Sequence, residues 1–211
     1  VQILENHQSV KALKDIDFNP TCRLKNIEAN TFRNCNLTGG TIDFHNDLES
    51  IGDSAFSGCK GLVGITFSVS DSKLKSIQQG AFYKTEALGT VTFPDSLETF
   101  ASSGTGSFQE SGITGIVFGT NTGTTKINSI PQNTFYSCKT LVGPVAFPDS
   151  VASIGNYAFR DCTNLKGISF GKTTSVLATI GYGAFYGCTS MDCALDLPDS
   201  LNTIYSSSYY P

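Results

Sequence analysis

The feature that most constrains the fold is a short unit that recurs along the whole 211-residue chain. Its consensus is L-x-x-I-G-x-x-A-F-x-x-C-x-x-L-x-x-I-x-F, and one copy reads "IGNYAFRDCTNLKGISF" at residues 154–170. Successive anchor residues lie 24, 26, 23, 30, 24, 26 and 24 positions apart. The anchors are Ile27, Ile51, Ile77, Phe100, Ile130, Ile154, Ile180 and Ile204. A period of this length indicates a solenoid of stacked coils.

Phenylalanine occupies fixed positions in the unit. Of the 15 phenylalanines, seven occupy the phenylalanine position of the A-F site, seven end the I-x-F segment, and Phe100 replaces an anchor isoleucine. In stacked coils, like residues form columns because each coil buries its apolar edge only against its neighbours. These columns are therefore predicted to be core, not an aromatic binding platform.

The I-x-F segments alternate β-branched and aromatic residues, which predicts one short strand per coil, parallel to the next. Segments such as "FPDS" after them are predicted turns. "IGNYAFRDC" is too short for an independent helix, so one helical or 3₁₀ turn is expected there. We expect a single solenoid over residues 1–211: a partial N-terminal repeat at 1–23, about seven full repeats and a partial C-terminal repeat.

A second period spans two coils. "FPDS" or "LPDS" occurs in alternate copies, and tyrosine follows the phenylalanine of the A-F site in alternate copies. The tyrosines are Tyr83, Tyr136 and Tyr186, and the alternate copies have Ser57, Gln109 and Arg160 at this position. One edge of the solenoid is thus predicted to be ridged every second coil. The fourth copy, "FASSGTGSF" at 100–108, departs from the unit and predicts a local bulge, which could act as a hinge or a ligand-facing loop.

The pattern L-x-x-I-x-F-P-x-S-V-x-x-I-G-x-x-A-F-x-x-C, clearest at 141–162 and 177–200, closely resembles the BspA-like class of leucine-rich repeats. The resemblance implies an α/β, β-rich, right-handed solenoid. A curved parallel sheet would line its concave face, and short strands or 3₁₀ or helical turns its convex side. It also implies a bacterial or protist surface protein, often involved in adhesion to host proteins or cells.

Composition excludes several classes of partner. Only 15% of residues are charged and the net charge is −4, so no basic surface for nucleic acid or anionic lipid is expected. No apolar run reaches the length of a membrane helix. Because the chain starts at Val1, we expect a mature fragment whose signal or anchor is missing, and an extracellular or cell-surface location.

Five of the seven cysteines share one repeat position: Cys35, Cys59, Cys138, Cys162 and Cys188. Thr85 and Ser111 replace cysteine there in two copies. This exchange indicates a position for a small side chain that donates a weak hydrogen bond to backbone carbonyls, which favours a structural role as a ladder of stacked residues. Disulfides remain an alternative, and a metal site is disfavoured because no C-x-x-C pair exists. For Cys22 and Cys193, outside this ladder, packing is favoured over reactivity and their oxidation state stays open.

The residues show no catalytic motif. His7 and His45 lie in no recognisable motif, and no nucleophile elbow, P-loop or Rossmann fingerprint occurs. Asp43 and Asp47 flank His45, which permits either a weak cation site or a solvated turn. We therefore expect no enzyme, no cofactor and no metal.

Outward-facing strand positions are the expected binding surface, on the concave face, because their neighbours must point into the core. The predicted contact residues are small or apolar: Val63, Thr66, Thr92, Val117, Ala146, Lys166, Ser169 and Asp196. Such a neutral face suits a protein ligand, for instance a host or extracellular-matrix protein. The alternative is a structural array that oligomerises through its faces or uncapped ends.

Overall fold

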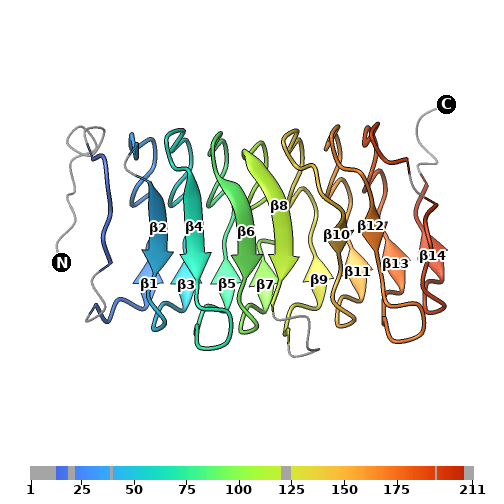
Figure 1. Cartoon of the computed structure of the whole chain (residues 1–211). Coiled ribbons are helices and arrows are strands. Elements are labelled where there is room, and N and C mark those ends of the chain that lie inside the picture. The colour runs from blue at the N-terminus through green and yellow to red at the C-terminus, as the bar shows by residue number, and fades with distance from the viewer. Residues whose placement is uncertain (1–12, 19–21, 39, 120–124, 193, 207–211) are drawn as a thin grey trace.

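A computed structural model of the chain describes residues 13–18, 22–38, 40–119, 125–192 and 194–206. The chain winds in successive coils, and its strands fall into two columns that run in opposite directions (Figure 1). Within each column every paired strand is parallel to its neighbour. The predicted solenoid of parallel strands is confirmed.

The first column is built from two-residue strands that each end on an anchor residue. They form two four-stranded sheets, in the orders β1-β3-β5-β7 and β14-β13-β11-β9. The strands are β1 (Asn26–Ile27), β3 (Ser50–Ile51), β5 (Ser76–Ile77), β7 (Thr99–Phe100), β9 (Ser129–Ile130), β11 (Ser153–Ile154), β13 (Thr179–Ile180) and β14 (Thr203–Ile204).

The second column contains the I-x-F segments, and its strands are hydrogen-bonded in pairs: β2 with β4, β6 with β8, and β10 with β12. Pairing by twos matches the two-coil period of the sequence. The strands are β2 (Thr41–Phe44), β4 (Gly64–Phe67), β6 (Gly89–Phe93), β8 (Ile113–Phe118), β10 (Val145–Ala146) and β12 (Ile168–Ser169).

The first column is interrupted between β7 and β9, and a proline accounts for the break. In other coils the residue after the anchor donates its N–H to the preceding anchor carbonyl, as Gly155 does to Ile130 at 2.7 Å. Pro131 stands at that place in the fifth coil and has no N–H to donate. The Phe100 carbonyl instead accepts the Thr99 hydroxyl at 2.7 Å. The ladder therefore stops at Pro131.

The predicted helical or 3₁₀ turn is wrong: the described residues contain neither kind of helix. Over 154–162 the backbone N–H groups alternate between two kinds of acceptor. Ala158 donates three residues back, to the Gly155 carbonyl, but Phe159 donates to the Ala184 carbonyl of the next coil at 2.8 Å. A helix would direct every N–H within its own segment. Half of these groups bond between coils, so the segment is a chain of tight turns.

Left-handed residues maintain this alternation. Tyr157 and Asp161, two positions before and after Phe159, have φ values of 57° and 58°. Left-handed backbone costs energy for residues other than glycine and interrupts a right-handed helix. Equivalent non-glycine residues in other coils are Asn30, Asn34, Ser54, Lys84, Glu110, Asn133 and Ser137.

The core is a stack of phenylalanines bounded by the two strand columns. Consecutive rings after the alanine position stack with centroids 4.9 to 5.6 Å apart, from Phe32 to Phe185. Phe108 at the middle also meets Phe93 of β6 edge-on at 5.4 Å. Such pairs add about 0.5 to 1.5 kcal/mol each beyond the burial of their area.

Candidate functional site

The exposed row of the second column is defined here as the outer row: Asp43, Thr66, Thr92, Val117, Ala146 and Ser169. Each lies between two core residues of its segment, and the backbone register pairs Asp43 with Thr66, Thr92 with Val117, and Ala146 with Ser169. All are exposed except Thr92, which is half-buried. The alternation of strands therefore places six neighbours on one face.

The outer row is weakly charged and locally ordered. The Thr66 hydroxyl donates a hydrogen bond to Asp43 Oδ1 at 2.7 Å. One oxygen of the single carboxylate in the outer row therefore already accepts a hydrogen bond. Val117 is 39% exposed, and the side chains of Ala146 and Ser169 also line a shallow pocket of about 290 Å³ together with Phe147. The middle of the face is thus small, apolar and accessible.

A second row of threonines lies beside the outer row and was not predicted. Thr41, Thr90 and Thr114 are exposed, and the hydroxyls of Thr90 and Thr114 lie 3.2 Å apart. The side chain of Thr90 leans over Gly115 of the next coil, where a Cβ would come within 2.9 Å of its hydroxyl. The sequence signal was T-x-T in β6, which places two hydroxyls on one face.

Three predicted contact residues lie outside the strands. Val63 precedes β4 and is 49% exposed, and Lys166 precedes β12. Each stands two positions before a core isoleucine, so a longer strand would have turned it inward. Asp196 is exposed in a segment without a described strand, 3.6 Å from the Lys172 ammonium. These residues flank the outer row and do not belong to it.

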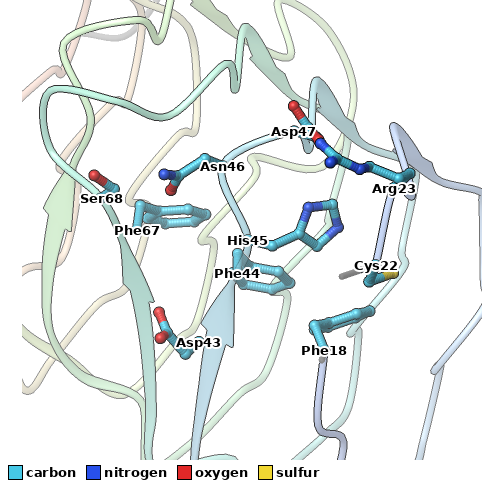
Figure 2. A pocket seen from close by; sticks show the side chains of 10 residues that line it. All are labelled: Phe18, Cys22, Arg23, Asp43, Phe44, His45, Asn46, Asp47, Phe67 and Ser68. Atoms are coloured by element: carbon cyan, nitrogen blue, oxygen red, sulfur yellow. The ribbon is translucent and has the colours of Figure 1, made fainter. Parts of the chain in front are cut away.

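A pocket of about 550 Å³ lies at the N-terminal part of the described solenoid and contains His45. Figure 2 shows the imidazole between the Phe18 ring and the Arg23 and Asp47 side chains. The Phe18 and His45 ring centroids are 6.0 Å apart. Both ring nitrogens of His45 are buried and have no hydrogen-bond partner. The pocket is lined by Phe18, Cys22, Arg23, Asp43, Phe44, His45, Asn46, Asp47, Phe67 and Ser68.

The carboxylates beside His45 are already paired. Asp47 accepts from Arg23 at 2.7 Å and from Lys73 at 2.6 Å, and these two hydrogen bonds lower its pKa to about 2. Two cationic side chains on one carboxylate oppose the binding of a further cation. Among the described residues no group of three or more His, Cys, Asp or Glu could hold a metal ion. His7 lies outside the described residues.

The repeat-position cysteines contact backbone carbonyls across coils. The thiols of Cys59, Cys138, Cys162 and Cys188 lie 2.9 to 3.1 Å from a phenylalanine carbonyl oxygen of the preceding coil. Where threonine replaces cysteine, the Thr85 hydroxyl donates instead to the Phe82 carbonyl of its own coil. The six described cysteines are free thiols: Cys22, Cys35, Cys59, Cys138, Cys162 and Cys188. Cys193 lies outside the described residues.

Burial makes four of these thiols, Cys35, Cys59, Cys162 and Cys188, poor nucleophiles. It raises the pKa of Cys35 and of Cys188 to about 11, and that of Cys59 to about 12. The pKa of Cys162 is raised as well, by its contact with the Cys138 thiol and by burial. Because the thiolate is the reactive species, a raised pKa disfavours thiol chemistry at neutral pH.

The part of the chain that the structure describes holds no helix of the length and hydrophobicity that crossing a bilayer requires. The BspA-type leucine-rich repeat model matches residues 6–114 and 128–211, in six copies. A comparison with curated proteins finds no match to the sequence.

Solved structures resemble this one in fold. The leucine-rich repeat protein of T. pallidum is similar at a TM-score of 0.64 and 23% identity, over 86% of this chain and 75% of that one. A leucine-rich cell surface protein of Faecalibacterium prausnitzii is similar at a TM-score of 0.50 and 22% identity, over 87% of this chain and 52% of that one. The pneumococcal vaccine antigen PcpA is similar at a TM-score of 0.50 and 22% identity, over 85% of this chain and 44% of that one. This chain therefore spans about half the length of the latter two proteins.

Proposed function

Because the chain belongs to the BspA-type leucine-rich repeat family, we propose that it is a non-enzymatic protein-binding module exposed outside the cell. Its partner, on this proposal, is a host or extracellular-matrix protein. The description of the similar F. prausnitzii chain as a cell surface protein supports the location.

The observation that carries the proposal is the outer row. It is a continuous exposed face of short side chains on paired parallel strands, with Val117 and Ala146 at its middle. A partner meeting this face removes apolar area from water and desolvates few charges, which is favourable for protein contacts. The face forms the concave side of the solenoid in this proposal.

Raised thiol pKa values support a role without catalysis. The pocket at His45 offers an imidazole, but the neighbouring carboxylate Asp47 is held by Arg23 and Lys73 and is a poor general base at a pKa of about 2. Turnover of any substrate in a panel of common hydrolase assays would contradict this part of the proposal.

The experiment measures binding of immobilised laminin, fibronectin and collagen to the wild type and to the Val117→Glu/Ala146→Glu double variant. Two buried carboxylates at the centre of an interface are expected to weaken binding at least tenfold. Val176→Glu is the matched control, because Val176 is 53% exposed outside the outer row. Equal binding by the double variant and the control would refute the outer row as the contact surface.

A second candidate is a structural array that self-associates. Ile204 and Tyr205 in and beside β14 are 58% and 55% exposed, and apolar residues at a strand favour pairing with another chain. Sedimentation velocity over a range of concentrations separates the two candidates. A monomer at every concentration would exclude self-association, and a dimer lost on Ile204→Glu would support it.

A further inference from the structure

Charged side chains gather just before the first strand column in the first three coils. They stand four and two positions before the anchor residue, on either side of a leucine: Arg23 and Lys25, Asp47 and Glu49, and Lys73 and Lys75. Leu48 and Leu74 are 1% and 0% exposed, so the alternation of an extended chain turns the charged side chains outward. The Glu49 N–H donates to the Lys25 carbonyl at 2.6 Å, and the Lys75 N–H to the Glu49 carbonyl at 2.9 Å. The three charged segments therefore lie side by side.

Four cations share two carboxylates in this group. Each carboxylate contacts one cation of the preceding coil and one of the following coil: Asp47 contacts Arg23 and Lys73 at 2.7 and 2.6 Å, and Glu49 contacts Lys25 and Lys75 at 3.2 and 3.9 Å. Hydrogen bonds from these cations lower the pKa of Asp47 and that of Glu49, so both carboxylates are charged at neutral pH. Two positive charges therefore remain in excess.

The cationic side chains extend further into solvent than the carboxylates. The Asp47 and Glu49 side chains are 21% and 33% exposed, whereas the four cations are 57 to 82% exposed. An ammonium has three donors and a guanidinium five, more than these contacts use. A molecule that approaches this face therefore meets positive charge and further hydrogen-bond donors. We define the four cations as the basic strip: Arg23, Lys25, Lys73 and Lys75.

The basic strip is a local feature. The net charge of the whole chain is −4, which gives no sign of it. The equivalent positions of the fourth and fifth coils contribute Glu98 and Lys126, which pair with each other at 3.8 Å. In the sixth to eighth coils these positions carry no charge: Ser150, Ala152, Val176, Ala178, Ser200 and Asn202. On this face, the excess of positive charge is thus confined to the coils of β1, β3 and β5 (Figure 1).

The arrangement suits an extended polyanion better than a small anion. Asp47 and Glu49 already occupy the points between the cations, so a small anion would compete with a carboxylate at each point. A linear polymer can instead contact the outward faces of several cations in neighbouring coils at once. Each such contact releases counterions condensed on the polymer, which favours the binding of chains with a high charge density.

We propose that the basic strip binds a sulfated polysaccharide that lies across the first three coils, with sulfate groups on the four cations. Sulfate groups are ionised at physiological pH, and ammonium and guanidinium groups donate strong charge-assisted hydrogen bonds to anionic oxygens. The choice of a sulfated glycan over a nucleic acid rests on the location outside the cell that the proposed function includes. The strip lies beside the first strand column, whereas the outer row belongs to the second.

The test measures binding of a fluorescent heparin decasaccharide to the whole protein by fluorescence anisotropy. The wild type is expected to bind, and its affinity should fall at least about tenfold between about 50 and 200 mM salt, because about four charge contacts are involved. Arg23→Gln/Lys73→Gln and Lys25→Gln/Lys75→Gln each remove two cations of the strip. Each double variant should weaken the complex at least about fivefold.

Lys60→Gln/Lys84→Gln is the matched control. It removes two exposed lysines outside the strip that each have a carboxylate of their own, Glu86 at 2.7 Å and Glu110 at 3.6 Å. The change in total charge equals that of the strip variants, but the local excess at the strip is kept. This variant should therefore bind heparin within about twofold of the wild type. Circular dichroism of each variant confirms that it is folded.

Four outcomes would overturn the proposal. They are no binding by the wild type at low salt, equal binding of a fully desulfated decasaccharide, equal binding of single-stranded DNA of the same charge, or equal losses in the strip and control variants. The two strip variants should bind immobilised laminin, fibronectin and collagen like the wild type. The basic strip and the outer row can therefore fail independently.

Discussion

The Cys162 thiol donates to the Phe135 carbonyl oxygen, 3.1 Å away in the preceding coil. The same oxygen also accepts the Cys138 N–H of its own coil at 3.2 Å. We predict that Cys162→Ser, which keeps a donor, changes the free energy of unfolding by less than about 0.5 kcal/mol. Cys162→Val, which removes it, should cost about 1 kcal/mol. Urea denaturation measures both, and equal losses would show that the hydrogen bond is unimportant.

The buried thiols predict a loss of stability at alkaline pH. The pKa of Cys35 and of Cys188 rises to about 11 in the folded chain and that of Cys59 to about 12, against 9.0 for an ordinary thiol. A raised folded-state pKa stabilises the protein below pH 9 and loses this effect as the pH rises toward 11 or 12. The midpoint of urea unfolding should therefore fall between pH 9 and 11. In a Cys35→Ser/Cys59→Ser/Cys188→Ser variant, this midpoint should fall less steeply with pH than in the wild type. An identical pH dependence of the midpoint in both proteins would exclude the thiols as the cause.

Removal of one ring from the phenylalanine stack should be costly. Phe108 is fully buried, stacks on Phe82 at 4.9 Å and meets Phe93 edge-on at 5.4 Å. Phe108→Ala is expected to lower the free energy of unfolding by about 3 to 5 kcal/mol, and Phe108→Leu by less. Thermal and urea unfolding followed by circular dichroism measure both. A loss under 1 kcal/mol for the alanine variant would mean that the stack contributes little.

The unusual fourth coil depends on a glycine. A Cβ on Gly106 would overlap the Asn133 carbonyl group, which is backbone of the next coil. Gly106→Ala should therefore lower the free energy of unfolding by at least about 2 kcal/mol, because neither coil can move without disrupting its contacts with the adjacent coils. Gly143→Ala is the matched control, since a Cβ there meets no atom within 4 Å. Similar melting temperatures for both variants would refute the close contact.

Pro131 and Thr99 are expected to be energetically coupled. The Thr99 hydroxyl bonds to the Phe100 carbonyl, next to the place where Pro131 has no N–H to donate. In the wild type, Thr99→Val should lower the free energy of unfolding by about 1 kcal/mol. In a Pro131→Gln background, which restores an N–H, the same change should cost less. A double-mutant cycle measures the coupling energy. Strictly additive losses of stability would show that the two residues are not coupled.

Much of the fold could be predicted because apolar residues recur at fixed intervals. The I-x-F segments predicted the second strand column, and the predicted parallel strands are present. The family resemblance implied the strands that end on the anchors only as an alternative to 3₁₀ or helical turns. The turn at 154–162 could not be predicted, since Tyr157 and Asp161 adopt left-handed backbone without the glycine that usually signals it. Local sequence does not reveal that half of its N–H groups bond to the next coil.

The candidate surface was predictable only where strand alternation holds. Thr66, Val117 and Ala146 follow from the position between two core residues. Val63 and Lys166 were placed on the same face because the strand starts, at Gly64 and Ile168, cannot be read from composition. The alternation of tyrosine with Ser57, Gln109 and Arg160 was visible in the sequence. The contacts of the Arg160 guanidinium with the rings of Tyr136, Tyr157 and Tyr186 depend on coil stacking.

The break at Pro131 has a mechanical consequence. Backbone hydrogen bonds between coils lie along the solenoid axis, so a stretching force along this axis loads every joint between coils at the same time. The weakest step is expected between β7 and β9, where the anchor carbonyl of Phe100 bonds within its own coil. In single-molecule stretching, the chain should yield first at this joint and release two blocks of coils, and Pro131→Gln should raise the force of that first event.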